Sequence, residues 1–360
     1  MTTTPIKVLI ADDSSLVRRI IRTVLTSDPL IQVVGEARNG LEAVELVAKL
    51  RPDIVTMDVR MPVLDGLGAT EEIMAYHPTP ILVLTGSIDR HDSGFTFQML
   101  SAGALEVIEK PRDFVGSQSE AVRRHLIERV KMLARVKVVT HLRGRRRSRL
   151  VPAAEDAAAP VQLPAPLLPG SQRVVLIGAS TGGPKVLHTM LGMLPPTFAG
   201  SLVIVQHIAE GFVANMVEWR GGNSALPVVL AADGMIIRPR QVIVAPDTHH
   251  LRLDEQCRIS LDLEPRALQY PSIDVTMHSA AEHCAKRTIG VILSGMGRDG
   301  AAGLLALRRA GAATLVQDEA SSAIFGMPRA ALENGAASET VSAAQLAARL
   351  VGLTALPQVP

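Results

Sequence analysis

In the first third of the chain, short runs rich in Val, Ile and Leu alternate with longer segments whose apolar residues recur every three to four positions. The short runs predict β-strands and the longer period predicts amphipathic helices. Regular alternation of the two predicts a doubly wound parallel sheet with helices on both faces. The expected strands are 7–11, 32–37, 54–57, 81–85 and 106–108, and the expected helices are 14–26, 40–50, 66–75 and 95–102.

The second half of the chain repeats this alternation and predicts a second doubly wound α/β domain of the Rossmann-like type. One segment, 227–263, alternates apolar and polar residues more like a β-hairpin, so we expect a hairpin excursion there. The other expected strands are 174–177, 202–206, 242–245, 289–293 and 314–316, and the expected helices are 184–194, 273–285 and 301–309.

A change of composition separates the two halves. Residues 123–149 contain eleven Lys or Arg residues and one acid, and residues 151–170 are rich in Ala, Pro and Leu. This pattern predicts a basic helix end followed by a semi-rigid linker. We therefore expect one domain at 1–125, a linker at 126–171 and a second domain at 172–353. The basic run favours a solvated linker over a nucleic-acid site, because no stacking aromatic residues accompany it.

Composition narrows the class of protein. At about 100–200 residues per domain, 360 residues suit two or three domains. A hydrophobic fraction of 47% excludes disorder throughout, and six Phe, two Tyr and one Trp mean that the cores are aliphatic. The formal net charge of +2 argues against a strongly basic nucleic-acid coat, so no nucleic-acid partner is expected.

The two cysteines and the first residues of the chain bear on the cellular compartment in which we expect the protein. Cys257 and Cys284 have no metal-ligand spacing and are too few for a disulfide scaffold. Residues 1–5 lack the basic start of a secretory signal, and no run of about 18 apolar residues suggests a membrane span. We therefore expect no membrane insertion and a cytoplasmic location.

Polar residues gather at the carboxyl ends of the first set of strands, where parallel α/β sheets bind ligands. Asp12 and Asp13 follow the first strand, Asp58 the third, Thr85 ends the fourth and Lys110 follows the fifth. Any one of these acids alone would fit a helix N-cap or a turn. Three carboxylates together favour Mg²⁺, and a hydroxyl and an ammonium suit phosphoryl oxygens. The sequence therefore predicts a Mg²⁺-dependent phosphoryl site.

The segments VLIADDSSLVRRI, DIVTMDVRMPVLDG, LT and VIEKP resemble those of bacterial response-regulator receiver domains, over roughly residues 5–125. The resemblance implies a flavodoxin-like fold of five parallel strands and phosphorylation of Asp58 by a histidine kinase. It also assigns Mg²⁺ to Asp12, Asp13 and Asp58, and switch roles to Thr85 and Lys110. Val107 stands where the family often has an aromatic switch side chain, so aromatic-rotamer signalling is not carried over.

The first strand of the second half runs directly into the segment GASTGGP at 178–184. Its G-x-S-x-G pattern allows a sharp turn that places the Ser180 hydroxyl near the amides of a helix N-terminus, a position suited to a nucleophile. The same Gly-rich turn would also suit a phosphate cradle or a plain N-cap serine. The dinucleotide pattern G-x-G-x-x-G is absent.

A serine nucleophile needs a base and an acid that orients the base. His207 directly follows strand 202–206, whereas His249 and His250 lie in the hairpin-like segment. Asp299 lies in SGMGRDGAAG after strand 289–293, and Asp318 after strand 314–316 is its rival. Ser, His and Asp at neighbouring strand ends make acyl transfer the best chemical interpretation.

The segments IGASTGGPKVL, VIVQHI, LSGMGRDGAAGL and VQDEASSAIFGMPRAA resemble the catalytic domain of the chemotaxis protein-glutamate methylesterase family, over roughly residues 172–353. The resemblance implies that Ser180 is the nucleophile, His207 the base and Asp299 the acid that orients it. Backbone amides near Met296 and Thr181 are its oxyanion candidates.

The family also implies substrates, partners and control. It implies removal of methyl esters from chemoreceptor glutamates, deamidation of receptor glutamines, no cofactor in the catalytic domain, and activation by phosphorylation of the receiver. Three other functions stay open from the residues alone: a DNA-binding response regulator, a small-ester hydrolase with a receiver, and a nucleotide-binding module at 178–183.

Overall fold

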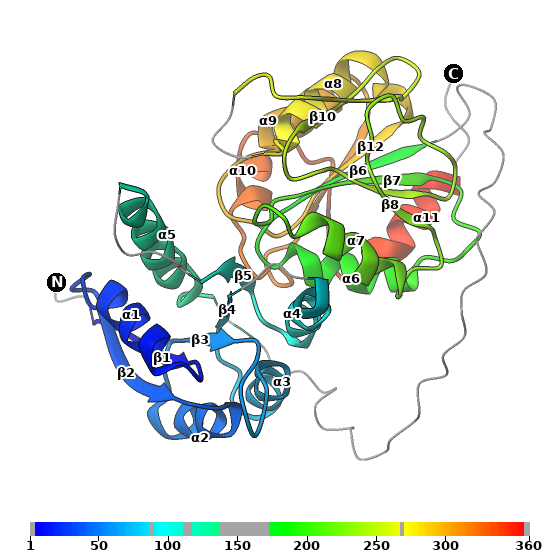
Figure 1. The fold of residues 1–360 in the computed structure, drawn as a ribbon. Helices are drawn as coiled ribbons and strands as arrows, with labels where there is room; N and C mark the ends of the chain where they lie inside the picture. Colours follow the sequence, from blue (N-terminus) through cyan, green and yellow to red (C-terminus); the bar gives the residue numbers. More distant parts are fainter. Residues whose placement is uncertain are drawn as a thin grey trace. The chain divides into compact units, whose positions relative to one another are not determined.

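The computed structural model describes residues 4–86, 90–110, 117–136, 138, 173–266 and 270–355. Contacts between residues divide the chain into two compact units, Met1–Glu155 and Asp156–Pro360. Most of the expected linker, including the basic run at 143–149, lies outside the described residues. Each unit is built around its own parallel sheet with helices on its faces (Figure 1).

The first unit is a doubly wound sheet of five parallel strands in the order β2-β1-β3-β4-β5, which confirms the expected flavodoxin-like topology. The side chains of Ser14, Asn39 and Asp65 each accept an amide hydrogen at the start of a helix, which explains where α1, α2 and α3 begin. In chain order the elements are β1 (Ile6–Ala11), α1 (Ser15–Leu25), β2 (Ile31–Ala37), α2 (Gly40–Leu50), β3 (Ile54–Asp58), α3 (Gly66–Tyr76), β4 (Ile81–Thr85), α4 (Arg90–Ala102), β5 (Glu106–Glu109) and α5 (Ser117–Leu133).

Helix α5 runs past the domain end that we expected at residue 125. Leu126, Val130 and Leu133 are buried, and Lys131 Nζ lies 2.9 Å from Asp28 Oδ2. The basic composition hid this packing, because the apolar residues recur with helical spacing on one face while the charges occupy the other. The first unit therefore includes all of α5.

The second unit has a seven-stranded parallel sheet in the order β14-β13-β12-β6-β7-β9-β8. The winding direction reverses at β6, since β7 lies on one side of it and β12 on the other, as in Rossmann-like folds. In chain order the elements are β6 (Val174–Ala179), α6 (Gly183–Met193), β7 (Ser201–Gln206), α7 (Val213–Gly221), β8 (Val228–Leu230), β9 (Val242–Val244), β10 (His250–Leu253), β11 (Ile259–Asp262), α8 (Ile273–His283), a 3₁₀ turn (Ala285–Arg287), β12 (Thr288–Ile292), α9 (Ala301–Arg309), β13 (Ala313–Gln317), α10 (Met327–Glu333), β14 (Glu339–Val341) and α11 (Leu346–Ala355).

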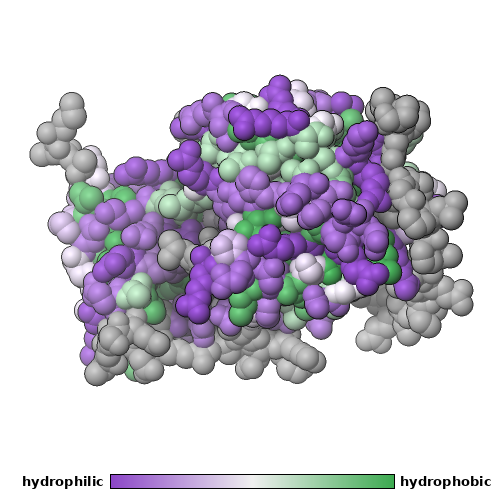
Figure 2. Space-filling model, turned by 90° about the horizontal axis from the view of Figure 1, so that it is seen from above, coloured by the Kyte–Doolittle hydropathy of each residue, from purple (hydrophilic) through white to green (hydrophobic). Residues whose placement is uncertain are grey.

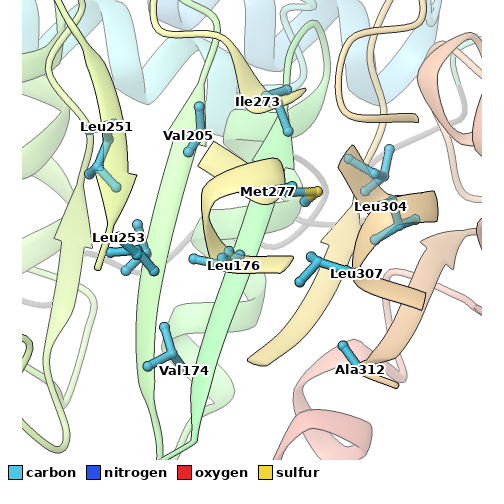
Figure 3. Close-up of a cluster of buried hydrophobic side chains, with 14 of the residues drawn as sticks. Val174, Leu176, Val205, Leu251, Leu253, Ile273, Met277, Leu304, Leu307 and Ala312 are labelled. Atoms are coloured by element: carbon cyan, nitrogen blue, oxygen red, sulfur yellow. The ribbon is translucent and has the colours of Figure 1, made fainter. Parts of the chain in front are cut away.

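The core of the second unit has two layers, one on each face of the sheet. Val174 and Leu176 of β6 pack with Met277 of α8 and with side chains of α9 (Figure 3). The intervening residues of β6, Val175 and Ile177, pack on the other face with α6 and α11. Both faces of the strand are buried, which explains its continuous apolar run.

The segment 227–263 forms a hairpin only in part. Strands β10 and β11 pair antiparallel as expected, but β8 and β9 join the main sheet in parallel. The expectation for residues 228–230 was therefore wrong, because alternation alone does not distinguish an edge strand of a parallel sheet from a hairpin arm. The short elements α7, α10, β14 and α11 were also not expected.

Hydrophilic residues predominate over the described surface in view in Figure 2, and the hydrophobic residues there form limited areas. The exposed large hydrophobic residues come from both units and include Leu16, Val63 and Met296. Single residues of this kind are ordinary on protein surfaces. No helix within the described ranges is long and apolar enough to cross a membrane.

Candidate active site

The central strands of the second sheet bring Ser180 and His207 to one edge. The register pairs Ala179 of β6 with Gln206 of β7, so the next residue of each strand leaves the sheet beside the other. The His207 amide donates to the Ala179 carbonyl at 2.9 Å. Because this edge is the carboxyl end of the strands at the point where the winding reverses, it is where such folds bind ligands.

Ser180 lies in a tight turn between β6 and α6 that is held from two sides. Its amide donates to the Ser294 carbonyl at 3.0 Å, and Gly182 has φ +79°, a left-handed conformation that favours glycine. A Cβ on Gly182 would lie 2.5 Å from Ala323 Cβ. Ser180 is 8% exposed, so the residue is largely buried in this turn.

His207 is hydrogen-bonded to Asp299, with 2.9 Å between Nε2 and Oδ2. Asp299 also receives hydrogen bonds from four further donors at the start of α8 and at its own loop. They are Ser272 Oγ (3.0 Å), Ile273 N (2.8 Å), Asp274 N (3.0 Å) and Gly300 N (3.0 Å). The carboxylate is therefore anchored at a helix N-terminus, where the helix dipole favours negative charge.

These contacts decide the ionisation of Asp299. Burial alone would raise its pKa, but the His207 hydrogen bond and charge, and then the Asp274 and Ile273 amides, outweigh burial and lower the pKa to about 2. An ionised carboxylate only accepts hydrogen bonds, so the neutral His207 ring carries its proton on Nε2. Nδ1 is then the basic nitrogen. Within the described part of the chain, the Ser180 hydroxyl makes no hydrogen bond.

The Gly loop after β12 lies directly against the serine. A Cβ on Gly295 would lie 2.7 Å from Ser180 Cβ, so only glycine lets the two backbones approach this closely. Met296, the next residue, is 49% exposed, and Thr181 is buried. The loop position suits an oxyanion site beside Ser180, and the roles of the Thr181 and Met296 amides stay a prediction.

The first unit holds the acidic cluster that the sequence predicted. Asp12, Asp13 and Asp58 each have a carboxylate oxygen within 4.8 Å of the others. Lys110 Nζ lies 2.7 Å from Asp12 Oδ2 and 2.8 Å from Asp58 Oδ1. Thr85 is buried at the end of β4, and its carbonyl accepts the Lys110 amide at 2.7 Å. The structure therefore brings all five residues to one edge of the sheet.

The ion pair with Lys110 does not fully offset the cost of burying the Asp58 carboxylate. Burial is the largest influence and, with the nearby Asp12 charge, raises the pKa of Asp58 to about 6 despite the Lys110 ion pair. The pKa of Lys110 is raised, because its bonds to both carboxylates outweigh burial. A further cation beside the three carboxylates would relieve their repulsion. The donor set of hard oxygen atoms therefore fits Mg²⁺.

Comparison with known proteins decides the family. The CheB methylesterase family matches residues 175–350, and the response regulator receiver domain matches residues 8–116. Protein-glutamate methylesterase/protein-glutamine glutaminase 4 of Geobacter metallireducens is 40% identical to this chain over 352 residues, 97% of this chain and 99% of that protein. The chain belongs to the CheB methylesterase family.

A second curated relative agrees with this assignment. A protein-glutamate methylesterase/protein-glutamine glutaminase of Anaeromyxobacter dehalogenans is 42% identical over 97% of each chain. The solved catalytic domain of Thermotoga maritima CheB methylesterase is 34% identical and covers 51% of this chain and 99% of that one, with a TM-score of 0.49. The chain is therefore an enzyme of the CheB family, a methylesterase that carries a receiver domain.

The structure separates the rival residues from this CheB site. His250 is fully buried, accepts from Ser272 N and contacts the Pro265 carbonyl, so both of its ring nitrogens are engaged. His249 bonds to the Thr248 hydroxyl. Asp318 accepts from the amide and hydroxyl of Ser321, as a turn residue does. Of the candidate acids, it is Asp299 that contacts His207.

Several residues that hold the two sites were missed from the sequence. Arg18 Nη1 donates to the carbonyls of Asp12 and Asp13 at 2.7 and 3.0 Å, and so fixes the acidic loop. Ser272 caps α8 and bonds to Asp299. Its position before the helical pattern at 273–285 was the available N-cap signal, but nothing local linked it to Asp299.

Proposed function

We propose that this chain hydrolyses γ-methyl esters of glutamate residues on the cytoplasmic domains of chemoreceptors, with Ser180 as nucleophile, His207 as base and Asp299 as the acid that orients His207. The observation that carries the proposal is the 2.9 Å hydrogen bond from His207 to Asp299 at the strand ends beside the Ser180 turn. The names of the relatives, protein-glutamate methylesterase and protein-glutamine glutaminase, supply the substrate class.

In the proposed reaction, Nδ1 of His207 takes the Ser180 hydroxyl proton as the oxygen attacks the ester carbonyl. The carbonyl oxygen becomes an oxyanion near the Gly295–Met296 loop, and the proton passes from His207 to the leaving methoxide, which departs as methanol. Water, deprotonated by His207, then cleaves the glutamyl ester on Ser180. The fixed negative charge of Asp299 stabilises the imidazolium in both steps.

The same residues would deamidate receptor glutamine. The protonated His207 then gives its proton to a leaving amine, so ammonia is released instead of methanol. The acyl-enzyme on Ser180 is the same in both reactions. An amide is the poorer leaving group, so we expect the ester to react faster than the amide at equal concentration.

Methanol release from methylated receptor membranes tests the catalytic assignment. Ser180→Ala should lower kcat by several powers of ten, because the members of a triad act as a unit. Ser342→Ala is a matched control, since its hydroxyl donates to the Gln345 side chain at an exposed turn before α11. A Ser180→Ala enzyme that releases methanol at close to the wild-type rate would show that the triad is misassigned.

We also propose that a histidine kinase transfers a phosphoryl group to Asp58 and that this activates the enzyme. Asp12, Asp13 and Asp58 would hold Mg²⁺, which supplies charge neutralisation for the incoming phosphoryl group. Lys110, already bonded to Asp58, would contact the phosphoryl oxygens, and Thr85 would follow as the switch hydroxyl. The phosphoryl group adds up to about two negative charges at this edge of the sheet.

A small-molecule phosphodonor tests the regulation. Methanol release by the full chain should rise with phosphodonor and Mg²⁺, and Asp58→Asn should abolish the rise while the unstimulated rate remains. Asp65→Asn is the matched control, because Asp65 caps α3 and asparagine caps helices equally well. Equal stimulation of the Asp58→Asn and wild-type enzymes would contradict the proposal, as would a truncation lacking residues 1–140 that is slower than the unphosphorylated full chain.

A further inference from the structure

A single side-chain amide connects the proposed nucleophile and the proposed base. Gln206, the last residue of β7, is 1% exposed. Its Nε2 donates to the Ser180 carbonyl at 3.0 Å and to the His207 carbonyl at 2.8 Å. Neither the G-x-S-x-G pattern nor the triad uses this residue.

The orientation of this amide follows from its surroundings. Both groups near Nε2 are carbonyl oxygens, so the opposite orientation would place Oε1 against two acceptors. Oε1 itself is buried and has no hydrogen-bond partner among the described residues. A Cβ on Gly183 would lie 3.0 Å from it. An unpaired buried acceptor destabilises a fold, so the value of Gln206 at this position lies in its two donor bonds.

The two carbonyls belong to residues that directly follow the neighbouring strands β6 and β7. The Ser180 carbonyl also closes the helix turn by accepting the Gly183 amide, and the His207 amide bonds to Ala179. Gln206 adds a side-chain link to these contacts, from one nitrogen to both residues. Rotation of either backbone would break one of its bonds.

We propose that Gln206 is a positioning residue that fixes the distance and direction between the Ser180 hydroxyl and the His207 ring. This inference rests on the proposed roles of those two residues. A displacement of about 1 Å between reacting groups can lower a rate about 100-fold, which is the size of effect that loss of such a link can produce.

Gln206→Met tests the inference, because methionine has a similar length and shape and no donor. We expect kcat for methanol release to fall 10- to 100-fold, with KM for methylated receptor within about twofold of wild type. Gln206→Glu should give an intermediate kcat, since a buried carboxylic acid keeps one donor. Gln241→Met is the matched control, because Gln241 is a buried glutamine before β9 at the opposite edge of the sheet.

Ser180→Ala, measured in the same series, distinguishes failure of the proposed function from failure of the positioning role of Gln206. If Ser180→Ala keeps the wild-type rate, the proposed function fails. If Ser180→Ala is inactive while Gln206→Met keeps kcat within twofold of wild type, the positioning role is overturned and the proposed function stands.

Equal losses of kcat in Gln206→Met and Gln241→Met, with equal falls in unfolding temperature, would also overturn the positioning role, because the effect would then be a general loss of packing. If Gln206→Met does not fold, Gln206→Glu decides by the same criteria.

Discussion

Asp299→Asn is the sharpest test of the proposed base, because the structure predicts how the new amide will turn. Each oxygen of Asp299 now faces only donors. Beside Oδ2 are His207 Nε2 and the Ile273 amide, and beside Oδ1 are the Asp274 and Gly300 amides and the Ser272 hydroxyl. An asparagine NH₂ group must therefore point at donors on one side or the other.

The NH₂ group of the new asparagine meets fewer fixed hydrogen-bond donors at the position of Oδ2 than at that of Oδ1. It has one fixed backbone donor, Ile273, whereas the Oδ1 side has two. The NH₂ group should then donate to His207 Nε2, which moves the ring proton to Nδ1 and removes the base from Ser180. In serine hydrolases of known mechanism a wrong tautomer of this kind lowers kcat about 10⁴-fold, and we expect a loss of that order here.

The variant should remain folded. The pKa of Asp299, about 2 against an ordinary 3.8, corresponds to roughly 2 kcal/mol of stabilisation. Because the folded pKa is the lower one, this contribution is present above the unfolded pKa and is lost as the pH falls toward 2. At pH 7 the substitution should lower the unfolding temperature by roughly 4–8 °C for a domain of this size.

Methanol release, circular dichroism and thermal unfolding together check this prediction. Asp318→Asn is the matched control, since Asp318 also follows a strand of the sheet but bonds to Ser321. It should keep a near wild-type kcat. A folded Asp299→Asn enzyme with kcat within tenfold of wild type would refute the reasoning, and loss of activity in Asp318→Asn alone would transfer the role to the rival acid.

Three further predictions concern the acidic cluster and the Gly loop. The affinity for Mg²⁺ measured by calorimetry should weaken as the pH falls through about 6, because Asp58 must lose its proton to bind the cation. An affinity that does not change between about pH 5 and 8 would contradict this. Asp58→Asn should raise the stability of the receiver at pH 7 by up to about 3 kcal/mol. Because the folded pKa of Asp58 is about 6, above the ordinary 3.8, its carboxylate is charged at pH 7 and the buried charge destabilises the fold, a cost that asparagine removes. An unchanged urea midpoint would count against this. Gly295→Ala should lower both kcat and stability, the latter by about 1–3 kcal/mol, because its Cβ meets Met327 Sδ and Ser180 Cβ, and a fully active, equally stable variant would show that the loop can move aside.

The local pattern of the sequence was sufficient for most of the secondary structure. Residues 81–85, 40–50 and 301–309 have the predicted limits, because strand and helix periods are local properties of the chain. Errors fell where the tertiary environment decides. The basic composition around residue 125 concealed the buried face of α5, and the alternation at 228–230 became a parallel edge strand.

What the sequence by itself determined was the set of reactive groups and the strand ends that carry them: acids and a lysine after the strands of the first unit, and a serine turn, a histidine and two acids after those of the second. The tertiary structure alone decided which groups meet. Asp299 rather than Asp318 contacts His207, 92 positions away, and one Gln206 nitrogen bonds to both Ser180 and His207. The physical reason is that strand order and crossovers set these contacts through long-range packing, which no local pattern of residues encodes.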